Sequence, residues 1–423
     1  MMIIKRTLLI MVMMSNHALA HEYLYPVAGV KKNNERYLYL LYQKDPTHLE
    51  LFLWHEKTKI ISKALPSSCI PASVRILPDQ KGFSFIDNGR IKLKLFNKRS
   101  PKAIDFHEPI YQVELIEWID SQNFYFCAKE NGTLGIFHAD RDGALYRICL
   151  QSTADCMYPQ KVENSLFYIE RTNQLIPHYA IKRMAYPEIL YEKSNFNAVH
   201  NFDKRVEQLL QLKNQGYNHQ NNLSVNQAAC LYASDKPLAF LRMTSADEGY
   251  FVQYADTIHS DDKSIRFEYH RLMKDEHGWK TSFLFYFDIP LLFLQEDSGS
   301  GYSYRSENPH KIHESILPLL PCHDDNEIYY MSASDDDHHI GLYSYTKETQ
   351  HITKHNQHDF LHDAFGMVKL DDTIFYGGAL HYHDNKDHGR FLYKTQPDGD
   401  LPLGMWINSD GFVCYDQPTL IRK

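Results

Sequence analysis

Histidine and aspartate gather in the last quarter of this sequence, where their side chains could bind a metal ion or transfer protons. The chain has 24 histidines, and nine of them lie between His338 and His388 among several aspartates. Imidazole and carboxylate groups together bind zinc, manganese or nickel. The candidate ligands of such a divalent metal are His338, His339, His355, His358, His362, His381, His383 and Asp384.

The spacing of these residues permits two interpretations. His355, His358 and His362 would converge on a helix, and His381 and His383 would point the same way on a strand. Histidine, aspartate and asparagine are equally typical of exposed hairpin turns, because they accept unusual backbone angles. The residues follow no fixed metal motif. We therefore favour turns and expect no cofactor, with a divalent metal as the alternative.

Other catalytic signatures are missing from the sequence. The run Ser298-Gly299-Ser300-Gly301 is not the Gly-x-Ser-x-Gly of a nucleophile elbow. His-Glu pairs occur, but none continues to the HExxH pattern of a zinc protease helix. The sequence thus favours a binding protein over an enzyme.

The histidine-rich region consists of two similar strand-turn-strand passages, residues 327–345 and 373–393. Comparable passages precede them, with an Asn-Gly hairpin signal at Asn88-Gly89 and again at Asn131-Gly132. Residues 195–226 interrupt the pattern and predict a helix followed by a polar loop. Strands with the same plan resume afterwards, so we interpret 195–226 as an insertion and keep a linker between two domains as the alternative.

Seven such units of roughly 35–60 residues predict an all-β protein with a single β-propeller. Each small sheet must pack against its neighbours, and closure of the ring removes open edges. We expect seven blades, with six as the alternative, over residues 21–423. The strand near Phe412 is expected to complete the blade that begins near Tyr37.

The N-terminus predicts an export signal over residues 1–20. Lys5 and Arg6 precede an apolar run, and Ala18-Leu19-Ala20 fits a cleavage site. The apolar run is too short to span a bilayer, and we expect no membrane span after cleavage. The predicted location is periplasmic or secreted.

Charge and cysteine content limit the classes of partner and the redox compartment that we expect for this protein. The formal net charge is −8, which argues against nucleic acid as a partner, although a local basic run extends from Lys92 to Lys102. We interpret that run as one polar strand face. Seven cysteines would leave one thiol over if disulfides form, and Cys149 and Cys156 could close a small loop. Free cysteines buried in strands are the alternative.

Two stretches resemble a known family. The segment 77–86, with Pro78-Asp79 before Gly82, resembles the Pro-Asp-x-x-Gly strand signature of TolB-like, WD40-like (PD40-type) bacterial β-propeller repeats. The pair 329–332 and 341–345 is similar to the central strands of that repeat. Other units lack the Pro-Asp turn, and no Trp-Asp dipeptide occurs. The resemblance implies a propeller fold, export and often protein binding.

We expect an exported, non-enzymatic propeller that binds a protein or peptide in the bacterial cell envelope. The alternative is a metal-assisted lyase or hydrolase acting on saccharides through the His/Asp loops, because some TolB-like propellers are oligogalacturonate lyases. No ligand of those enzymes can be matched residue by residue here. The length leaves no room for an α/β-hydrolase domain, so we do not expect a propeller-capped peptidase.

Overall fold

The structure is a computed structural model of the chain. It describes residues 23–32, 35–45, 48–55, 61–66, 68–70, 73–106, 110–130, 132–149, 151, 153–186, 228–255, 264–290, 295–296, 303–304, 321–323, 326–333, 340–355, 361–371, 373–380, 389–394, 401–407 and 411–414. The described residues form strands and connecting turns, without a helix of more than one turn. None of them forms a helix long and apolar enough to cross a membrane.

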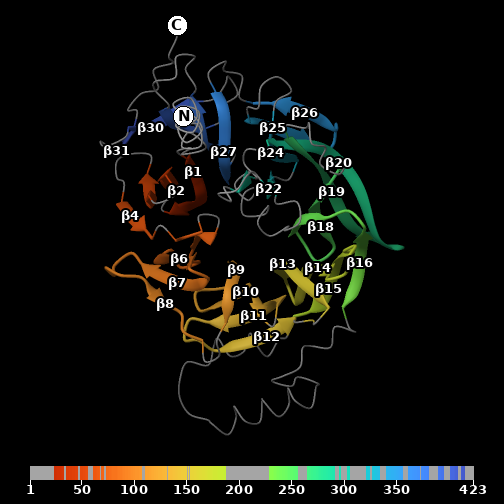
Figure 1. Cartoon of the computed structure of the whole chain (residues 1–423). Helices are drawn as coiled ribbons and strands as arrows, with labels where there is room; N and C mark the ends of the chain where they lie inside the picture. The colour runs from red at the N-terminus through yellow and green to blue at the C-terminus, as the bar shows by residue number, and fades with distance from the viewer. Residues whose placement is uncertain are drawn as a thin grey trace, which may run out of the picture.

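The strands form sheets arranged around a common centre, which is the arrangement of a β-propeller (Figure 1). Sheet 1 contains β1 (Tyr23–Lys32), β2 (Glu35–Asp45), β3 (His48–His55) and β4 (Ile61–Leu65). Sheet 2 contains β5 (Arg75–Ile76), β6 (Gly82–Asp87), β7 (Arg90–Leu95) and β8 (Lys102–Ala103). Sheet 3 contains β9 (Tyr111–Trp118), β10 (Asn123–Glu130), β11 (Thr133–Asp140) and β12 (Leu145–Cys149).

The second half of the ring continues the same plan. Sheet 4 contains β13 (Ala154–Val162), β14 (Ser165–Thr172), β15 (Tyr179–Ala185) and β16 (Ala229–Ser234). Sheet 5 contains β17 (Leu238–Met243), β18 (Glu248–Tyr254), β19 (Ser264–Asp275) and β20 (Gly278–Pro290). Sheet 6 contains β23 (Cys322–His323), β24 (Glu327–Ala333), β25 (Ile340–Thr346), β26 (His351–Lys354), β27 (Leu361–Leu370), β28 (Thr373–Leu380), β29 (Gly389–Lys394), β30 (Leu401–Ile407) and β31 (Gly411–Cys414).

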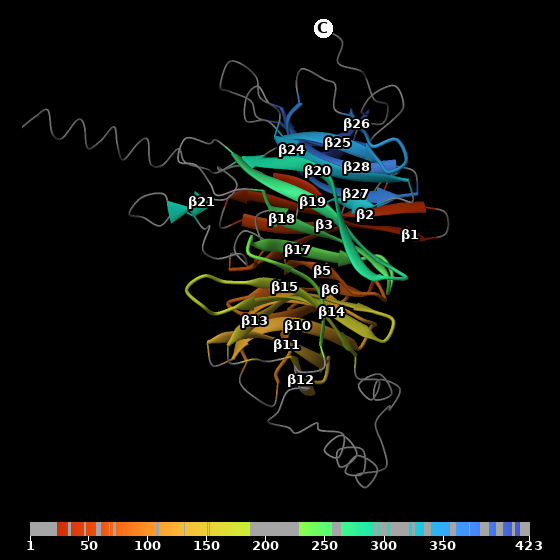
Figure 2. The ribbon, with the colours of Figure 1, turned by 90° about the vertical axis from the view of Figure 1, so that its right-hand side faces the viewer.

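A small two-stranded sheet lies apart from these six. It pairs β21 (Gln295–Glu296) with β22 (Ser303–Tyr304). Figure 1 shows β22 near the middle of the ring, and Figure 2 shows β21 beyond the ends of the other strands, on one side. The small sheet therefore lies on one face of the ring.

The predicted propeller is confirmed, but the expectation of seven blades is wrong, because six sheets form the ring. Sheet 6 holds two successive antiparallel meanders, β23–β26 and β27–β31. A single parallel bridge between Ile340 and Asp363 joins them into one sheet. The sequence shows two repeats here, whereas backbone pairing fuses them, and periodicity carries no information about such a bridge.

Two further expectations concern the ends and the insertion. Strand β31, which contains Phe412, pairs with β30 inside sheet 6, so it does not complete sheet 1 as expected. Sheet 1 already has four strands of its own, so it needs no strand from the C-terminal end. The expected helical insertion, 195–226, lies outside the described residues.

Local sequence explains the hairpins. Asn88 and Gly89 both have positive φ, 50° and 70°, and they connect β6 to β7 as the two-residue turn that Asn-Gly favours. The Pro78-Asp79 turn is closed by hydrogen bonds from Leu77 N to Gly82 O, 3.0 Å, and from Gln80 N to Leu77 O, 2.8 Å. These two predicted turns are confirmed.

Aromatic and aliphatic side chains fill the space between adjacent sheets. Sheets 3 and 4 share one buried cluster with part of sheet 5, and sheets 5 and 6 share another. Full burial of one such side chain contributes ~1.5–3 kcal/mol relative to its exposure to water. The ring is closed by packing of β1 against β27 and β28, through a buried cluster that includes Trp54 and Phe375. Side-chain packing between sheets therefore holds the ring together.

Candidate binding site

A hollow of about 610 Å³ opens between sheet 2 and sheet 3. One wall is the turn between β7 and β8, and the other is formed by the turn between β11 and β12 together with Gln122. The lining residues are Leu93, Leu95, Lys98, Arg99, Ser100, Lys102, Ala103, Ile104, Gln122, Arg141 and Asp142.

The turn that carries Arg141 is fixed by its own hydrogen bonds. Asp140 Oδ1 accepts hydrogen bonds from the backbone N of Asp142 and of Ala144, each 2.9 Å long. Gly143 has φ +94°, and a Cβ there would lie 2.1 Å from the carbonyl oxygen of Asp105. Only glycine fits this position, which keeps the turn packed against the end of sheet 2.

The hollow is positively charged. Lys98, Arg99 and Lys102 are exposed, and none of them forms an ion pair with a carboxylate of the described residues. Arg141 is half-buried, and its Nη1 donates to the carbonyl of Ser121, 3.1 Å away. Asp142 supplies the one carboxylate of the lining. Four cations and one acid therefore give the lining a positive charge, which suits an anionic group.

A second hollow, of about 510 Å³, lies on the other side of sheet 2, against sheet 1. Its walls are largely aromatic and aliphatic, and the rings of Tyr39 and Phe96 stack at 6.0 Å. Its lining residues are Val30, Tyr37, Tyr39, Leu51, Phe52, Leu53, Asp79, Gln80, Lys81 and Phe96.

Both hollows lie on the same face of the ring. The turns at 78–81, 96–101 and 141–144 each follow a strand that runs in the same direction through its antiparallel sheet. Phe96 lines the aromatic hollow, and Lys98, two residues further along the same turn, lines the basic hollow. The turn at 96–101 therefore borders both the aromatic hollow and the basic hollow.

Part of this site is visible in the sequence, but its structural role was predicted wrongly. The run from Lys92 to Lys102 was visible as a basic patch, and we interpreted it as a polar strand face. Lys94 is in fact buried, and its Nζ donates to the backbone carbonyl of Arg99. Lys98, Arg99 and Lys102 lie in or beside a turn. Nothing in the sequence indicated that Arg141 belongs to this site, because only the packing of sheet 3 beside sheet 2 brings it to the hollow.

Most of the predicted metal ligands cannot be placed. His338, His339, His358, His381, His383 and Asp384 lie outside the described residues. His362 belongs to β27, but its side chain is not described. Where the structure gives side chains, no group of three or more His, Cys, Asp or Glu residues is arranged to hold a metal ion. The metal site therefore stays a prediction.

His355 is the one predicted ligand whose surroundings are visible. Its Nε2 lies 2.8 Å from Ser344 Oγ, and its ring lies 5.6 Å from the ring of Tyr329. Burial lowers the pKa of His355, partly offset by the nearby Glu327 carboxylate. These contacts explain its position through packing and one hydrogen bond.

One backbone contact does bring two of the histidine-rich stretches together. The parallel bridge in sheet 6 pairs Ile340, which follows His339, with Asp363, which follows His362. The starts of β25 and β27 are therefore adjacent, which no spacing in the sequence indicated.

A buried polar cluster between sheets 5 and 6 was also missed. His323 Nε2 and the hydroxyl of Tyr269 are 2.6 Å apart, while Nδ1 is buried and has no hydrogen-bond partner among the described residues. Burial, and after it the charges of Arg242 and Lys347, lowers the pKa of His323 to about 3. The ring is therefore neutral at pH 7. Cys322-His323 is a two-residue strand without any recognisable motif.

Comparison with known proteins identifies the fold and no more. Neither a known protein family nor a curated protein matches the sequence. A puromycin-hydrolyzing peptidase of Mycobacterium tuberculosis is similar in structure, with a TM-score of 0.52 and 8% identity over 96% of this chain and 54% of the peptidase. A prolyl endopeptidase has a TM-score of 0.50 and 10% identity over 95% of this chain and 51% of the enzyme.

A TolB protein of Agrobacterium tumefaciens is a weaker match, with a TM-score of 0.37 and 16% identity over 64% of this chain and 82% of the TolB chain. The chain spans about half the length of the peptidases that it matches. At such low identity the likeness shows the architecture alone. The chain is therefore an all-β protein built as a single β-propeller.

Proposed function

We propose that this chain is an exported, non-enzymatic β-propeller that binds an acidic segment of a protein partner in the hollow between sheets 2 and 3. The observation that carries the proposal is the set of four cations, Lys98, Arg99, Lys102 and Arg141, around one hollow. The chain as a whole has a net charge of −8, so this positive region stands out against an acidic surface. The signal-like residues 1–20 support a periplasmic or secreted location.

Charge complementarity favours a carboxylate-rich ligand. Arginine pairs with carboxylates through two parallel hydrogen bonds, and lysine adds charge. A hollow excludes part of the water that weakens ion pairs at an open surface. The aromatic hollow on the same face supplies a surface for an apolar side chain next to the acidic ones, as in protein interfaces with an aromatic anchor.

The lining supports binding more than catalysis. Apart from its basic side chains, its groups with catalytic potential are the Ser100 hydroxyl and the Asp142 carboxylate. Among the described residues, no histidine lines the hollow beside Ser100 as the usual base of a serine nucleophile would.

Binding of an Asp/Glu-rich peptide, labelled with a fluorophore, tests the proposal. We expect saturable binding that weakens as salt rises, because the interaction is electrostatic. Lys98→Glu/Lys102→Glu should weaken the affinity by about 100-fold, or ~2.7 kcal/mol. The matched control is Lys274→Glu/Lys280→Glu in the β19–β20 hairpin, which changes net charge equally. Equal losses in both variants, or none in the first, would refute the site.

The alternative function is a metal-assisted lyase or hydrolase that acts on saccharides through the His/Asp loops. The bridge between Ile340 and Asp363 favours it, because the residues before them, His339 and His362, belong to the predicted ligand set. Metal analysis of the purified protein tests this alternative. Absence of stoichiometric metal at neutral pH, with no effect of a chelator on stability, would exclude it.

A further inference from the structure

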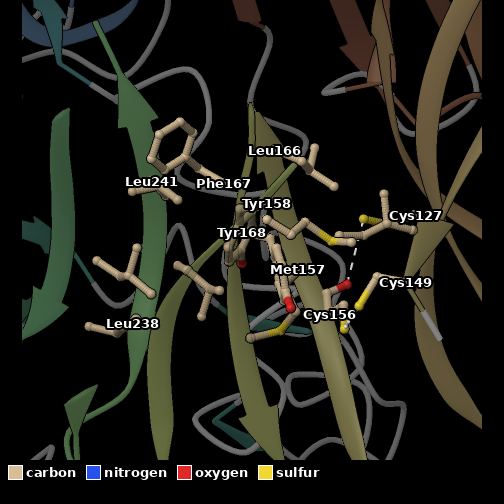
Figure 3. Close-up of a cluster of buried hydrophobic side chains, with 14 of the residues drawn as sticks. Cys127, Cys149, Cys156, Met157, Tyr158, Leu166, Phe167, Tyr168, Leu238 and Leu241 are labelled. Atoms are coloured by element: carbon tan, nitrogen blue, oxygen red, sulfur yellow. Dashed lines mark hydrogen bonds between the residues drawn. The ribbon is translucent and has the colours of Figure 1, made fainter. Parts of the chain in front are cut away.

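Three buried cysteines meet where sheet 3 packs against sheet 4 (Figure 3). Cys149 ends β12, Cys156 lies in β13, and Cys127 lies in β10. Each of these side chains is at most 2% exposed. Two strands of different sheets thus place thiols in one apolar cluster.

Cys149 and Cys156 are much closer to one another than buried packing requires. Their Sγ atoms are 2.8 Å apart, about 0.8 Å more than the ~2.05 Å of a disulfide bond. Cys127 differs, because its Sγ faces the backbone carbonyl oxygen of Cys156, 3.8 Å away, as the dashed line in Figure 3 shows. The geometry therefore selects one pair out of three thiols.

The two thiols also interact with one another in the packed cluster. The Cys156 thiol interacts with Cys149, and this contact lowers the pKa of Cys149 and raises that of Cys156. The Gln151 amide lies 3.8 Å from Cys156 Sγ and donates to Glu170, 2.7 Å away. In the packed cluster Cys149 is thus the more acidic of the two thiols.

We propose that Cys149 and Cys156 form a disulfide that ties sheet 3 to sheet 4. The Cys149 thiolate attacks the disulfide of a thiol oxidant, such as oxidised glutathione, and releases one thiol. The Cys156 thiolate then attacks the Cys149 sulfur of the mixed disulfide and releases the second thiol. The two protein thiols lose two electrons and two protons, and the oxidant disulfide is reduced to two thiols.

Burial determines when this reaction happens. Neither sulfur is accessible once the two sheets have packed, so exchange precedes the closure of the cluster during folding. The inference rests on the proposed export, because disulfides persist in oxidising compartments. It makes no use of the basic hollow, so either proposal can fail without the other.

The bond can be tested by refolding the reduced, denatured chain in a glutathione redox buffer. Remaining thiols are then alkylated under denaturing conditions, and the protein is digested with trypsin. Residues 148–161 form one tryptic peptide that contains both cysteines and no other. We expect this peptide to be unalkylated and lighter by two hydrogen atoms, while peptides with Cys69 and Cys127 are alkylated. Two alkylated cysteines in it, or a cross-link to Cys127, would overturn the proposal.

Thermal unfolding gives an independent measurement. Protein refolded in the presence of reductant should melt roughly 3–6 °C below the oxidised protein, because it lacks a short covalent loop. The variant Cys149→Ala/Cys156→Ala should show no such shift. The control variant Cys127→Ala should keep it, even if its melting temperature is lower in both conditions. A reductant effect that persists without Cys149 and Cys156 would also overturn the proposal.

Discussion

The seam that closes the ring and the seam between sheets 2 and 3 use cations differently. At the closure, Lys31 Nζ lies 3.1 Å from Asp371 and Arg36 Nη2 lies 3.3 Å from the same carboxylate. Between sheets 2 and 3, Lys98 and its neighbours surround an open hollow without an ion-pair partner among the described residues. Cations that are paired internally support the fold, whereas unpaired cations around a hollow are available to a ligand.

Packing explains why one seam is closed and the other is open. At the closure, Gly29 lies so near Leu370 that a Cβ would be 2.6 Å from its Cγ, and Trp54 meets Phe375 edge to face at 6.5 Å. The two sheets are thus in close contact at these positions. At the other seam, the outer strand β8 has only two residues, and its preceding turn stands away from sheet 3. A short outer strand in sheet 2 thus accompanies the basic hollow.

The largest effect is expected from Phe375→Ala at the closure. Phe375 is fully buried, and its truncation should lower the free energy of unfolding by ~3–5 kcal/mol. Urea unfolding followed by tryptophan fluorescence measures this. Ile352→Ala on the exposed strand β26 is the control and should cost less than ~0.5 kcal/mol. A loss at Phe375 no larger than in the control would mean that the closure does not stabilise the ring.

The seam between sheets 5 and 6 differs from both, because it contains a buried titratable group, His323. The pKa of His323 is about 3 when folded and 6.5 in the unfolded chain, so between these values the unfolded chain binds more protons. The contribution of neutral His323 to the free energy of unfolding is therefore fully present above pH 6.5 and is lost as the pH falls toward 3. At pH 5 the loss should be about 2 kcal/mol, at ~1.4 kcal/mol per pH unit.

Unfolding of His323→Gln across this pH range measures that contribution. The variant should show a shallower loss of stability between pH 6.5 and pH 4 than the wild type. The exposed His351→Gln is the matched control and should follow the wild-type curve. Identical pH dependence in all three proteins would show that His323 is protonated without cost.

A carboxylate introduced into the basic hollow should pair with its cations, as Asp371 pairs with Lys31 at the closure. Ser100→Asp places an acid beside Lys98 and Arg99. We expect affinity for an acidic peptide to fall by about tenfold, with no loss of folding stability. Fluorescence anisotropy and a thermal melt measure the two quantities. Ser100→Asn is the uncharged control. Equal binding by both variants would show that the charge of the hollow does not matter.

The smallest effect is expected from Asp371→Ala, which removes the acid of the closure seam. Its hydrogen bond and attraction to Lys31, with help from Arg36, hold the pKa of Asp371 below its ordinary value. The pair is exposed, so we expect the melting temperature to fall by no more than about 2 °C at low salt. High salt should erase the difference. A larger fall that persists in high salt would show a structural role beyond charge.

Local patterns in the sequence were sufficient for the fold class. Alternating apolar residues predicted strands, and the Asn88-Gly89 and Pro78-Asp79 turns predicted hairpins that the structure confirms. The number of blades was mispredicted, because it depends on one parallel bridge between Ile340 and Asp363. That bridge is a backbone contact between strands whose side-chain pattern is the same with or without it.

The candidate site was predictable only in part. The basic run was readable from residue 92 onward, but the burial of Lys94 and the arrival of Arg141 depend on how sheets 2 and 3 meet. The short spacing of Cys149 and Cys156 in the sequence indicated that they could be close. That Cys127 does not pair with either of them follows only from where the three sulfur atoms lie in the structure. The low pKa of His323 follows from burial between sheets.

The sequence by itself therefore determined what is local: strand periodicity, turn chemistry, the export-like N-terminus and the repeat that builds a propeller. Tertiary structure decided what depends on neighbours distant in the chain. It set the blade count, the pairing of Lys31 with Asp371, and the absence of such a partner for Lys98 among the described residues. The physical reason is that a side chain's charge and shape are written in the sequence, whereas its solvent exposure and its partners are fixed only when separate sheets pack together.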